Sequence, residues 1–232
     1  MALRRVVTLD ALGTLVALRQ PAPLLVSELR ARGAQCSERQ AAIAIGAEIA
    51  YYRAQLDTGV DRASLARLRE RCAAVLGEAL EEAGAVLSGL SQAQLLEALL
   101  AALRFEAYPE VPAALRALRA AGHRLVVVSN WDVSLHEMLR RSGLDALVDA
   151  AISSAEAGVA KPSPVIFQRA LALVGAHADD GLHAGDSLEH DVAGARAAGL
   201  RPVLVARFAR PPDAPAGVAV IASLAELPAL AA

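Results

Sequence analysis

The chain has 232 residues, a length that suits one large domain or a core domain with an insert. Hydrophobic residues make up 55% of it, which excludes an intrinsically disordered chain, and the formal net charge of −2 gives no reason to expect nucleic acid or an anionic membrane as a partner. The two cysteines, Cys36 and Cys72, form neither a metal-binding pattern nor a secreted disulfide framework. The first apolar run is too short for a signal peptide or a membrane span, so we expect a cytoplasmic protein.

The first predicted element is a buried strand at residues 5–10, and the stretch that follows, residues 17–104, contains no strand-like run. Ser37 and Ser91 each stand three residues before a glutamine, which is the capping box that starts a helix. Leucines at helical spacing follow Ser91. We therefore expect about four helices in this stretch, forming an all-helical insert.

From residue 109 onward, helices and short apolar runs alternate. Residues 109–122 predict a helix that begins among prolines and ends at Gly122, and Ser163 with Pro164 predicts the start of another. The runs that predict strands lie at 123–130, 148–153, 181–186 and 201–206. Continuous apolar runs of this length are typical of strands that are buried on both faces of a parallel sheet.

This pattern predicts an α/β fold with a Rossmann-like parallel sheet flanked by helices. We expect residues 1–16 and 105–232 to form this core, and the helical insert at 17–104 to follow the first strand.

Polar residues follow the predicted strands at the edge where ligands bind in parallel sheets. Asp10 ends the first strand, Ser129 and Asn130 end the second, Lys161 lies after the third, and Asp186 ends the fourth. A carboxylate can attack phosphorus, Mg²⁺ prefers carboxylate oxygens, and an ammonium with a hydroxyl neutralises phosphoryl oxygens. The set therefore predicts phosphoryl transfer with Mg²⁺ as cofactor and a small phosphorylated substrate.

Lys161 is the single lysine in a chain with 23 lysine and arginine residues, and Asn130 is the single asparagine. A chain that uses arginine elsewhere keeps a lysine where a compact ammonium is needed. Both residues stand in the segments just described, which strengthens their assignment to one active site.

Four segments of the chain resemble the four motifs of the haloacid dehalogenase-like (HAD) hydrolase superfamily. They are Asp-Ala-Leu-Gly-Thr-Leu from Asp10, Val-Val-Val-Ser-Asn ending at Asn130, Lys161 with Pro162, and Gly-Asp-x-x-x-x-Asp from Gly185. The resemblance covers the whole chain and is greatest to subfamily I, whose C1-type cap occupies the position of the helical insert. Within it, Ser-Asn-Trp-Asp, Lys-Pro-x-Pro-x-x-Phe and His-x-Gly-Asp-Ser look most like the DREG-2-like hydrolases.

The resemblance implies a role for each matched residue. Asp10 would be the nucleophile and a metal ligand, with Asp186 as the second carboxylate ligand. The backbone carbonyl of Leu12 would supply the third protein oxygen. Ser129 would hold the phosphoryl group, with Asn130 close by as a second substrate-binding residue.

The remaining implied roles belong to two charged residues. Lys161 would pair with Asp10 and the transferring oxygens. Asp191 would be an outer carboxylate that orients Lys161 or the metal's water.

One position departs from the family pattern. Phosphatases of this superfamily usually have a second aspartate two residues after the nucleophile, as general acid and base, and here that residue is Leu12. Leucine neither protonates a leaving alkoxide nor activates water, a loss that typically costs about 10²–10⁴ in rate. Asp132 and His190 are the candidates to replace it.

Three functions are therefore open. The first is Mg²⁺-dependent phosphate-ester hydrolysis through an aspartyl-phosphate at Asp10. The second is 2-haloacid dehalogenation of a halogenated acid through a metal-free aspartyl ester, which needs no acid for the leaving halide; Asp186 argues against it, since similar dehalogenases have uncharged residues there. The third is a catalytically weak domain that binds a phosphorylated ligand. We expect a monomer or a homodimer.

Overall fold

The computed structural model describes residues 6–87, 89–208 and 216–231. Contacts divide the chain into two compact units, one comprising residues up to Ala17 and from Glu106 onward, the other Leu18–Phe105. The chain passes between the units through strands β2 (Val16–Leu18) and β3 (Phe105–Ala107), which pair in a two-stranded sheet that the sequence pattern did not predict.

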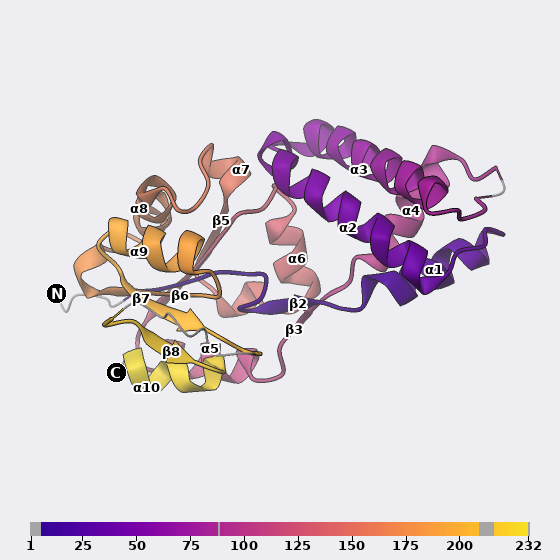
Figure 1. The fold of residues 1–232 in the computed structure, drawn as a ribbon. Coiled ribbons are helices and arrows are strands. Elements are labelled where there is room, and N and C mark those ends of the chain that lie inside the picture. The colour runs from indigo at the N-terminus through magenta and orange to yellow at the C-terminus, as the bar shows by residue number, and fades with distance from the viewer. Residues whose placement is uncertain (1–5, 88, 209–215, 232) are drawn as a thin grey trace. The chain divides into compact units, whose positions relative to one another are not determined.

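The first unit is built on a six-stranded parallel sheet in the order β5–β4–β1–β6–β7–β8 (Figure 1). Its strands are β1 (Val6–Leu9), β4 (Arg124–Ser129), β5 (Ala150–Ser153), β6 (Gly181–Gly185), β7 (Arg201–Val205) and β8 (Ala219–Ile221). The predicted α/β fold with a Rossmann-like sheet is confirmed. Five of the six strands lie within or beside the predicted runs, and β8 is an addition at the edge.

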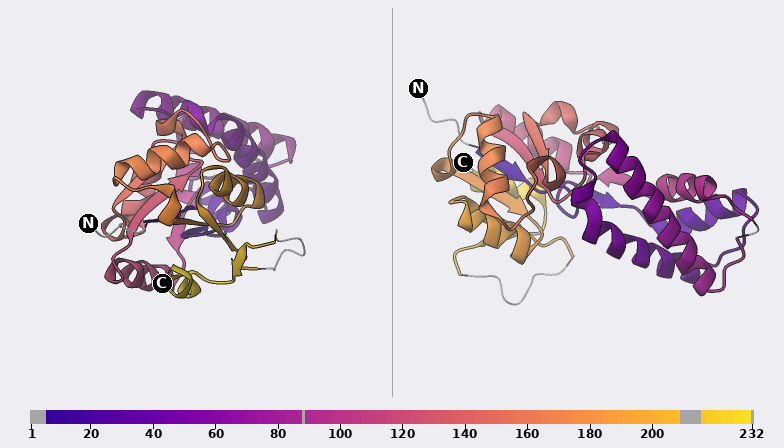
Figure 2. Two further views of the ribbon diagram at one scale, coloured as in Figure 1. Left: turned by 90° about the vertical axis from the view of Figure 1, so that its left-hand side faces the viewer. Right: turned by 90° about the horizontal axis from the view of Figure 1, so that it is seen from above.

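Helices cover both faces of this sheet. They are α5 (Val111–Ala120), α6 (Leu135–Arg141), α7 (Ser154–Ala157), α8 (Pro164–Leu173), α9 (Gly194–Ala197) and α10 (Leu227–Ala231). Helices α8 and α9 lie on one face and α5 and α10 on the other (Figures 1 and 2). Ser163 is the N-cap of α8, and its hydroxyl accepts a hydrogen bond from the Val165 backbone N–H, as the sequence predicted.

The strands are mostly apolar because both faces of the sheet are covered. Residues 125–128 of β4 and most of β1 are fully buried. Among the buried polar residues of the strands, Thr8 and His183 are fully buried in the middle of the sheet and occupy paired positions on β1 and β6. Such residues are unexpected in a hydrophobic core and point to the site built at the end of these strands.

In the described part of the second unit there are four α-helices, α1 (Pro21–Ala31), α2 (Glu38–Gln55), α3 (Arg62–Glu82) and α4 (Gln92–Ala102), with a short 3-10 turn at Leu56–Thr58. The predicted capping boxes at Ser37 and Ser91 are confirmed, and Asp61 with Ser64 forms a third. The unit has its own core, lined by leucines including Leu25, Leu29, Leu76, Leu80 and Leu99. Each buried leucine contributes roughly 1.5–3 kcal/mol, so this core stabilises the packing of the four helices against one another.

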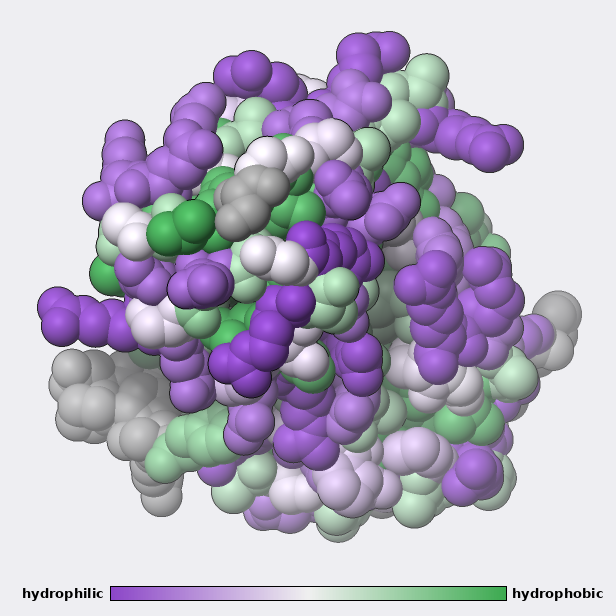
Figure 3. Space-filling view, turned by 90° about the vertical axis from the view of Figure 1, so that its right-hand side faces the viewer, coloured by the Kyte–Doolittle hydropathy of each residue, from purple (hydrophilic) through white to green (hydrophobic). Residues whose placement is uncertain are grey.

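Hydrophilic side chains dominate the surface drawn in Figure 3, with smaller groups of hydrophobic residues between them. Among the described residues, no helix combines the length and the apolar composition needed to cross a membrane.

Candidate active site

Asp10 directly follows β1, at the carboxyl end of the parallel sheet. Its backbone N–H donates to the Ala184 carbonyl at 2.9 Å, which fixes it against β6. On the other side, the Ser129 hydroxyl at the end of β4 donates to Asp10 Oδ1 at 3.1 Å. One neighbouring strand therefore holds the backbone of Asp10 and the other its carboxylate, and the side chains of Asp10 and Ser129 are both buried.

Lys161 lies between two carboxylates. Its Nζ donates to Asp10 Oδ1 and to Asp191 Oδ1, both at 2.6 Å, and only 2% of its side chain is exposed. Within the described residues, every hydrogen bond to the Asp10 side chain reaches Oδ1. Asp10 Oδ2 thus keeps its lone pairs for a reacting atom or a cation.

Asn130 holds the backbone of Lys161. Its Oδ1 accepts from Lys161 N at 2.8 Å and its Nδ2 donates to Lys161 O at 3.0 Å. The predicted contact of Asn130 with substrate stays a prediction, and the hydrogen bonds observed give its amide a part in positioning Lys161.

Asp191 projects from the helical segment Leu188–Ala193 and is held by three donors. Lys161 and His183 Nε2, at 3.0 Å, reach Oδ1, and the Ser187 N–H reaches Oδ2 at 2.9 Å. A Cβ added at Gly185 would overlap the Asp191 side chain. The glycine therefore leaves the space that this carboxylate occupies.

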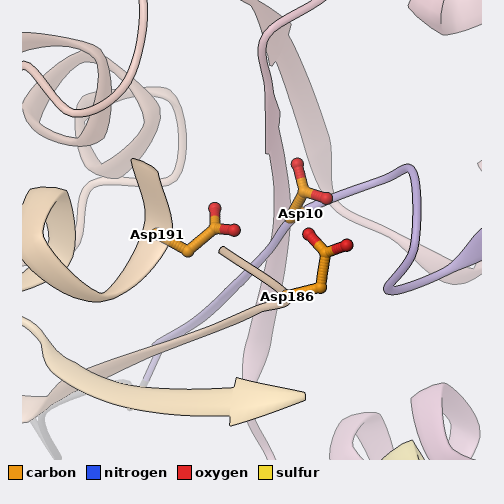
Figure 4. Close-up of side chains that lie close together, drawn as sticks. All are labelled: Asp10, Asp186 and Asp191. Atoms are coloured by element: carbon orange, nitrogen blue, oxygen red, sulfur yellow. The ribbon is translucent and has the colours of Figure 1, made fainter. Parts of the chain in front are cut away.

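Asp186, the residue after β6, is exposed and lies against the loop that follows Asp10. A Cβ at Gly13 would overlap the Asp186 carboxylate, and Gly13 also has a φ of 84°, which favours glycine. Carboxylate oxygens of Asp10, Asp186 and Asp191 lie within 4.8 Å of one another, as Figure 4 illustrates for the three side chains.

This grouping is electrostatically strained. Burial, reinforced by the charges of Asp191 and Asp186, raises the pKa of Asp10 to about 6 although Lys161 opposes the rise. Burial and Asp191 also raise the pKa of Asp186. Burial works against ionised Asp191 too, but the Lys161 charge and the His183 hydrogen bond outweigh it and hold the pKa of Asp191 below its usual range.

The residues fit a divalent cation. The three carboxylates and one ammonium carry a net charge of −2 when all are ionised, which one Mg²⁺ would balance. All three are hard oxygen donors of the kind that Mg²⁺ prefers. Asp10 and Asp186 are the pair best suited to hold it, because Asp191 already accepts three hydrogen bonds.

Arg207 anchors the loop that carries Leu12 and Gly13. Its guanidinium donates to the carbonyls of Gly13 at 3.0 Å and Thr14 at 2.6 Å, pairs with Glu110 at 2.6 Å, and lies 3.5 Å from the centre of the Tyr108 ring. Arg207 could not be singled out from the sequence, where one arginine among 22 carries no signal of its own. Only the fold brings Arg207, two residues after the end of β7, beside this loop.

Leu12 itself is half-buried, and it brings no acid or base to the site. Asp132 is buried and its Oδ1 accepts from the Ser134 N–H at 2.7 Å, while His190 is exposed on the helical segment after Ser187. The structure gives Asp132 a local capping contact, so a proton-transfer role for either residue stays a prediction.

The family follows from comparison with known proteins. A family model of haloacid dehalogenase-like hydrolases matches residues 4–199. The chain belongs to this family. The family resemblance seen in the four motifs is thereby confirmed. The hydrogen bonds described above connect one residue from each motif: Asp10, Ser129, Lys161 and Asp191.

Two relatives of this HAD-like hydrolase match at substantial identity. It is 44% identical over 94 residues to haloacid dehalogenase-like hydrolase domain-containing protein 3 of Bos taurus, covering 40% of this chain and 38% of that protein. It is 37% identical over 147 residues to a phosphoserine phosphatase of Thermus thermophilus, covering 62% of this chain and 57% of that protein. The matches thus span less than two thirds of either relative.

Solved structures share the fold. The L-2-haloacid dehalogenase of Xanthobacter autotrophicus superposes with a TM-score of 0.70 over 98% of both chains at 21% identity. At this identity the likeness concerns the fold alone, and the reaction has to be argued from the residues of the site.

Proposed function

We propose that this HAD-like hydrolase is a Mg²⁺-dependent phosphatase that hydrolyses a small phosphate ester through an aspartyl-phosphate at Asp10. The observation that carries the proposal is the buried Asp10–Lys161–Asp191 ion-pair chain with Asp186 beside it. The excess negative charge of these three carboxylates favours the binding of a divalent cation. A cation beside a carboxylate nucleophile in turn favours a phosphate ester as the substrate. The phosphoserine phosphatase relative is consistent with this chemistry.

In the first step, which forms the aspartyl-phosphate, each side chain of the site has a separate role. Asp10 Oδ2 attacks phosphorus, the bond from phosphorus to the ester oxygen breaks, and the leaving group departs with the electron pair. Lys161 and Ser129 hold Oδ1 and supply donors beside the transferring phosphoryl group. Mg²⁺, held by Asp10, Asp186 and the Leu12 carbonyl, would supply neutralisation of the phosphoryl charge.

In the second step water attacks phosphorus, which releases inorganic phosphate and restores the Asp10 carboxylate. Position 12 would normally carry the base for this water, and leucine does not act as one. A good leaving group removes the need for an acid in the first step but not for a base in the second. We therefore infer that hydrolysis of the aspartyl-phosphate is slower than its formation with aryl phosphates.

Two other functions compete with this proposal. A dehalogenase would have to bind a carboxylate substrate beside three aspartates, Asp10, Asp186 and Asp191, whose charges are offset only by the ammonium of Lys161. Without a cation, binding another negative charge there is electrostatically unfavourable. A non-catalytic binding domain has less need of a nucleophile held by Ser129 and Lys161. The helical unit is proposed to act as the cap, and we retain a cytoplasmic location as a proposal.

Phosphate and halide release distinguish the three functions. The protein is assayed with p-nitrophenyl phosphate in Mg²⁺ and in chelator, and with 2-chloropropionate in chelator. The proposal predicts phosphate release that requires Mg²⁺ and is abolished by Asp10→Asn, with Asp145→Asn on the same unit as the control. Halide release in chelator would instead support the dehalogenase, and Mg²⁺ binding without either activity would support the binding domain.

A further inference from the structure

We propose that His183 is a positioning residue whose Nε2–H orients the Asp191 carboxylate toward Lys161. The inference rests on the proposed function only for its effect on turnover, because the contacts themselves lie in the core of the sheet. His183 is in the middle of β6, three residues before Asp186, and is fully buried.

A buried imidazole is costly unless both ring nitrogens have partners. Here both do: Nε2 lies 3.0 Å from Asp191 Oδ1, and Nδ1 lies 2.9 Å from the Thr8 hydroxyl. Thr8 is the register partner of His183 on the neighbouring strand, and the Phe167 ring stands edge-on to the imidazole at 4.9 Å between centres. Apolar packing around a fully paired ring fixes its orientation.

The hydrogen-bond partners determine which nitrogen carries the proton. Asp191 is an acceptor in its ionised form, so Nε2 has to donate to it. The Thr8 hydroxyl can then donate to Nδ1, or it can donate to the Leu182 carbonyl at 3.2 Å while a doubly protonated ring donates to it. In both cases His183 is a donor to Asp191.

The geometry explains why Asp191 needs this donor. His183 and Gly185 are two residues apart on β6 and therefore face the same side of the sheet. The missing side chain at Gly185 lets Asp191 enter above His183, and the two donors on Oδ1, from His183 and Lys161, fix the rotation of the carboxylate. Thr8, His183, Asp191, Lys161 and Asp10 thus form one continuous buried hydrogen-bonded chain that ends at the nucleophile.

The single lysine of the chain gives a direct test. Protein labelled with ¹⁵N at lysine Nζ gives one ammonium signal, which reports on Lys161 without further assignment and without any need for activity. We expect a slowly exchanging, sharp signal in the unmodified protein and in His183→Gln, which keeps a donor. In His183→Leu, a variant of similar bulk without a donor, the signal should broaden and exchange faster.

The matched control is His123→Leu. His123 is also buried, but it directly precedes β4, at the opposite end of the strand from Ser129. Loss of a buried histidine there should leave the Lys161 signal unchanged. The inference is wrong if the Lys161 signal is the same in His183→Leu as in the unmodified protein. It is also wrong if His183→Leu and His123→Leu change the signal equally, because His183 would then only fill space in the core.

Turnover gives the second readout. His183→Leu should lower kcat for p-nitrophenyl phosphate about 10–100-fold with KM nearly unchanged, and His183→Gln should restore most of it. An unmodified protein that releases no phosphate overturns the proposed function, while the ammonium signal still decides the role of His183. A normal kcat in a folded His183→Leu variant would overturn the role of His183 and leave the proposed function standing.

Discussion

Lys161 occupies a gap whose size is set by two carboxylates. Its Nζ lies 2.6 Å from one oxygen of Asp10 and 2.6 Å from one oxygen of Asp191, and Asn130 holds its backbone on both sides. A guanidinium is planar and wider than an ammonium, so it cannot make both short contacts without displacing one carboxylate. The narrow space between the two carboxylates is a physical reason for lysine at position 161, although all other basic Lys/Arg positions in the chain are arginine.

Lys161→Arg should therefore impair catalysis although the charge is kept. We expect kcat for p-nitrophenyl phosphate to fall at least about 100-fold, because displacement of the nucleophile by about 1 Å has effects of that size. The reverse substitution at an exposed position, Arg116→Lys on α5, is the control and should leave kcat unchanged. A Lys161→Arg variant with normal turnover would mean that Lys161 contributes only charge.

At position 12 we predict a substitution that increases kcat. Leu12→Asp restores the residue type that phosphatases of this family usually have at that position, and acid–base catalysis contributes about 10²–10⁴ in rate. We expect a larger increase in kcat with an alkyl phosphate, whose alkoxide needs a proton, than with p-nitrophenyl phosphate. Leu12→Asn, similar in size but unable to transfer a proton, serves as the control. Equal gains with Asp and Asn would contradict the assignment.

The elements show which features were predictable from the sequence. Strands β1, β4, β5, β6 and β7 could be predicted because burial on both faces requires continuous apolar residues. Strands β2, β3 and β8 were missed because three-residue pairings depend on tertiary contacts. Asp10, Ser129 and Lys161 could be grouped because parallel strands end at one edge. The hydrogen bonds of His183 with Thr8 and Asp191 could not be predicted, since they depend on the register between β1 and β6.

Arg207 illustrates a contact between elements that only the fold reveals. It satisfies the carbonyls of Gly13 and Thr14, and a lysine in its place lacks the fork needed to reach both and Glu110. Arg207→Lys should lower stability by about 1–3 kcal/mol, the typical cost of leaving buried polar groups unpaired. Denaturant unfolding measures this loss, with Arg116→Lys as the control. The same variant should bind Mg²⁺ more weakly, because the anchored loop carries Leu12; unchanged affinity would separate Arg207 from the metal site.

At the scale of the whole molecule, the chain contains two units that the sequence divided at residues 16/17 and 104/105 and the structure divides at 17/18 and 105/106. The leucine-rich core of the helical unit and the sheet of the other unit arise from different hydrophobic patterns, which is why the change in periodicity along the chain marks the division. The substrate-specific contacts of such a molecule depend on side-chain positions that no local pattern encodes.

Stability of the whole molecule should depend on Mg²⁺ and pH together. Mg²⁺ at 100 times its Kd would stabilise the folded state by about 2.7 kcal/mol, which is roughly 5–10 °C in Tm for a chain of this size. Burial raises the pKa of Asp10 to about 6, so below that pH a proton competes with the cation. The apparent affinity for Mg²⁺ should fall about tenfold per pH unit below 6.

Thermal melts at pH 7.5 and pH 5 with and without Mg²⁺ measure this coupling. Without the cation the contribution of Asp10 has the opposite sign: between its ordinary pKa of 3.8 and about 6, Asp10 binds more protons in the folded than in the unfolded state, so its own contribution to stability should rise as the pH falls through that window. Asp186→Asn should abolish the Mg²⁺ shift, and Asp145→Asn should preserve it. A shift of equal size at both pH values would contradict the assignment of the cation to these carboxylates.

The most direct test of a phosphatase reaction through Asp10 is to trap the phosphorylated form of that residue. During turnover of p-nitrophenyl phosphate in Mg²⁺, the reaction is quenched with borohydride, which reduces an acyl phosphate, and the peptides are analysed by mass spectrometry. We predict homoserine at position 10, in an amount close to one per active site because Leu12 slows the second step. Phosphate release with position 10 recovered only as unmodified aspartate would contradict it.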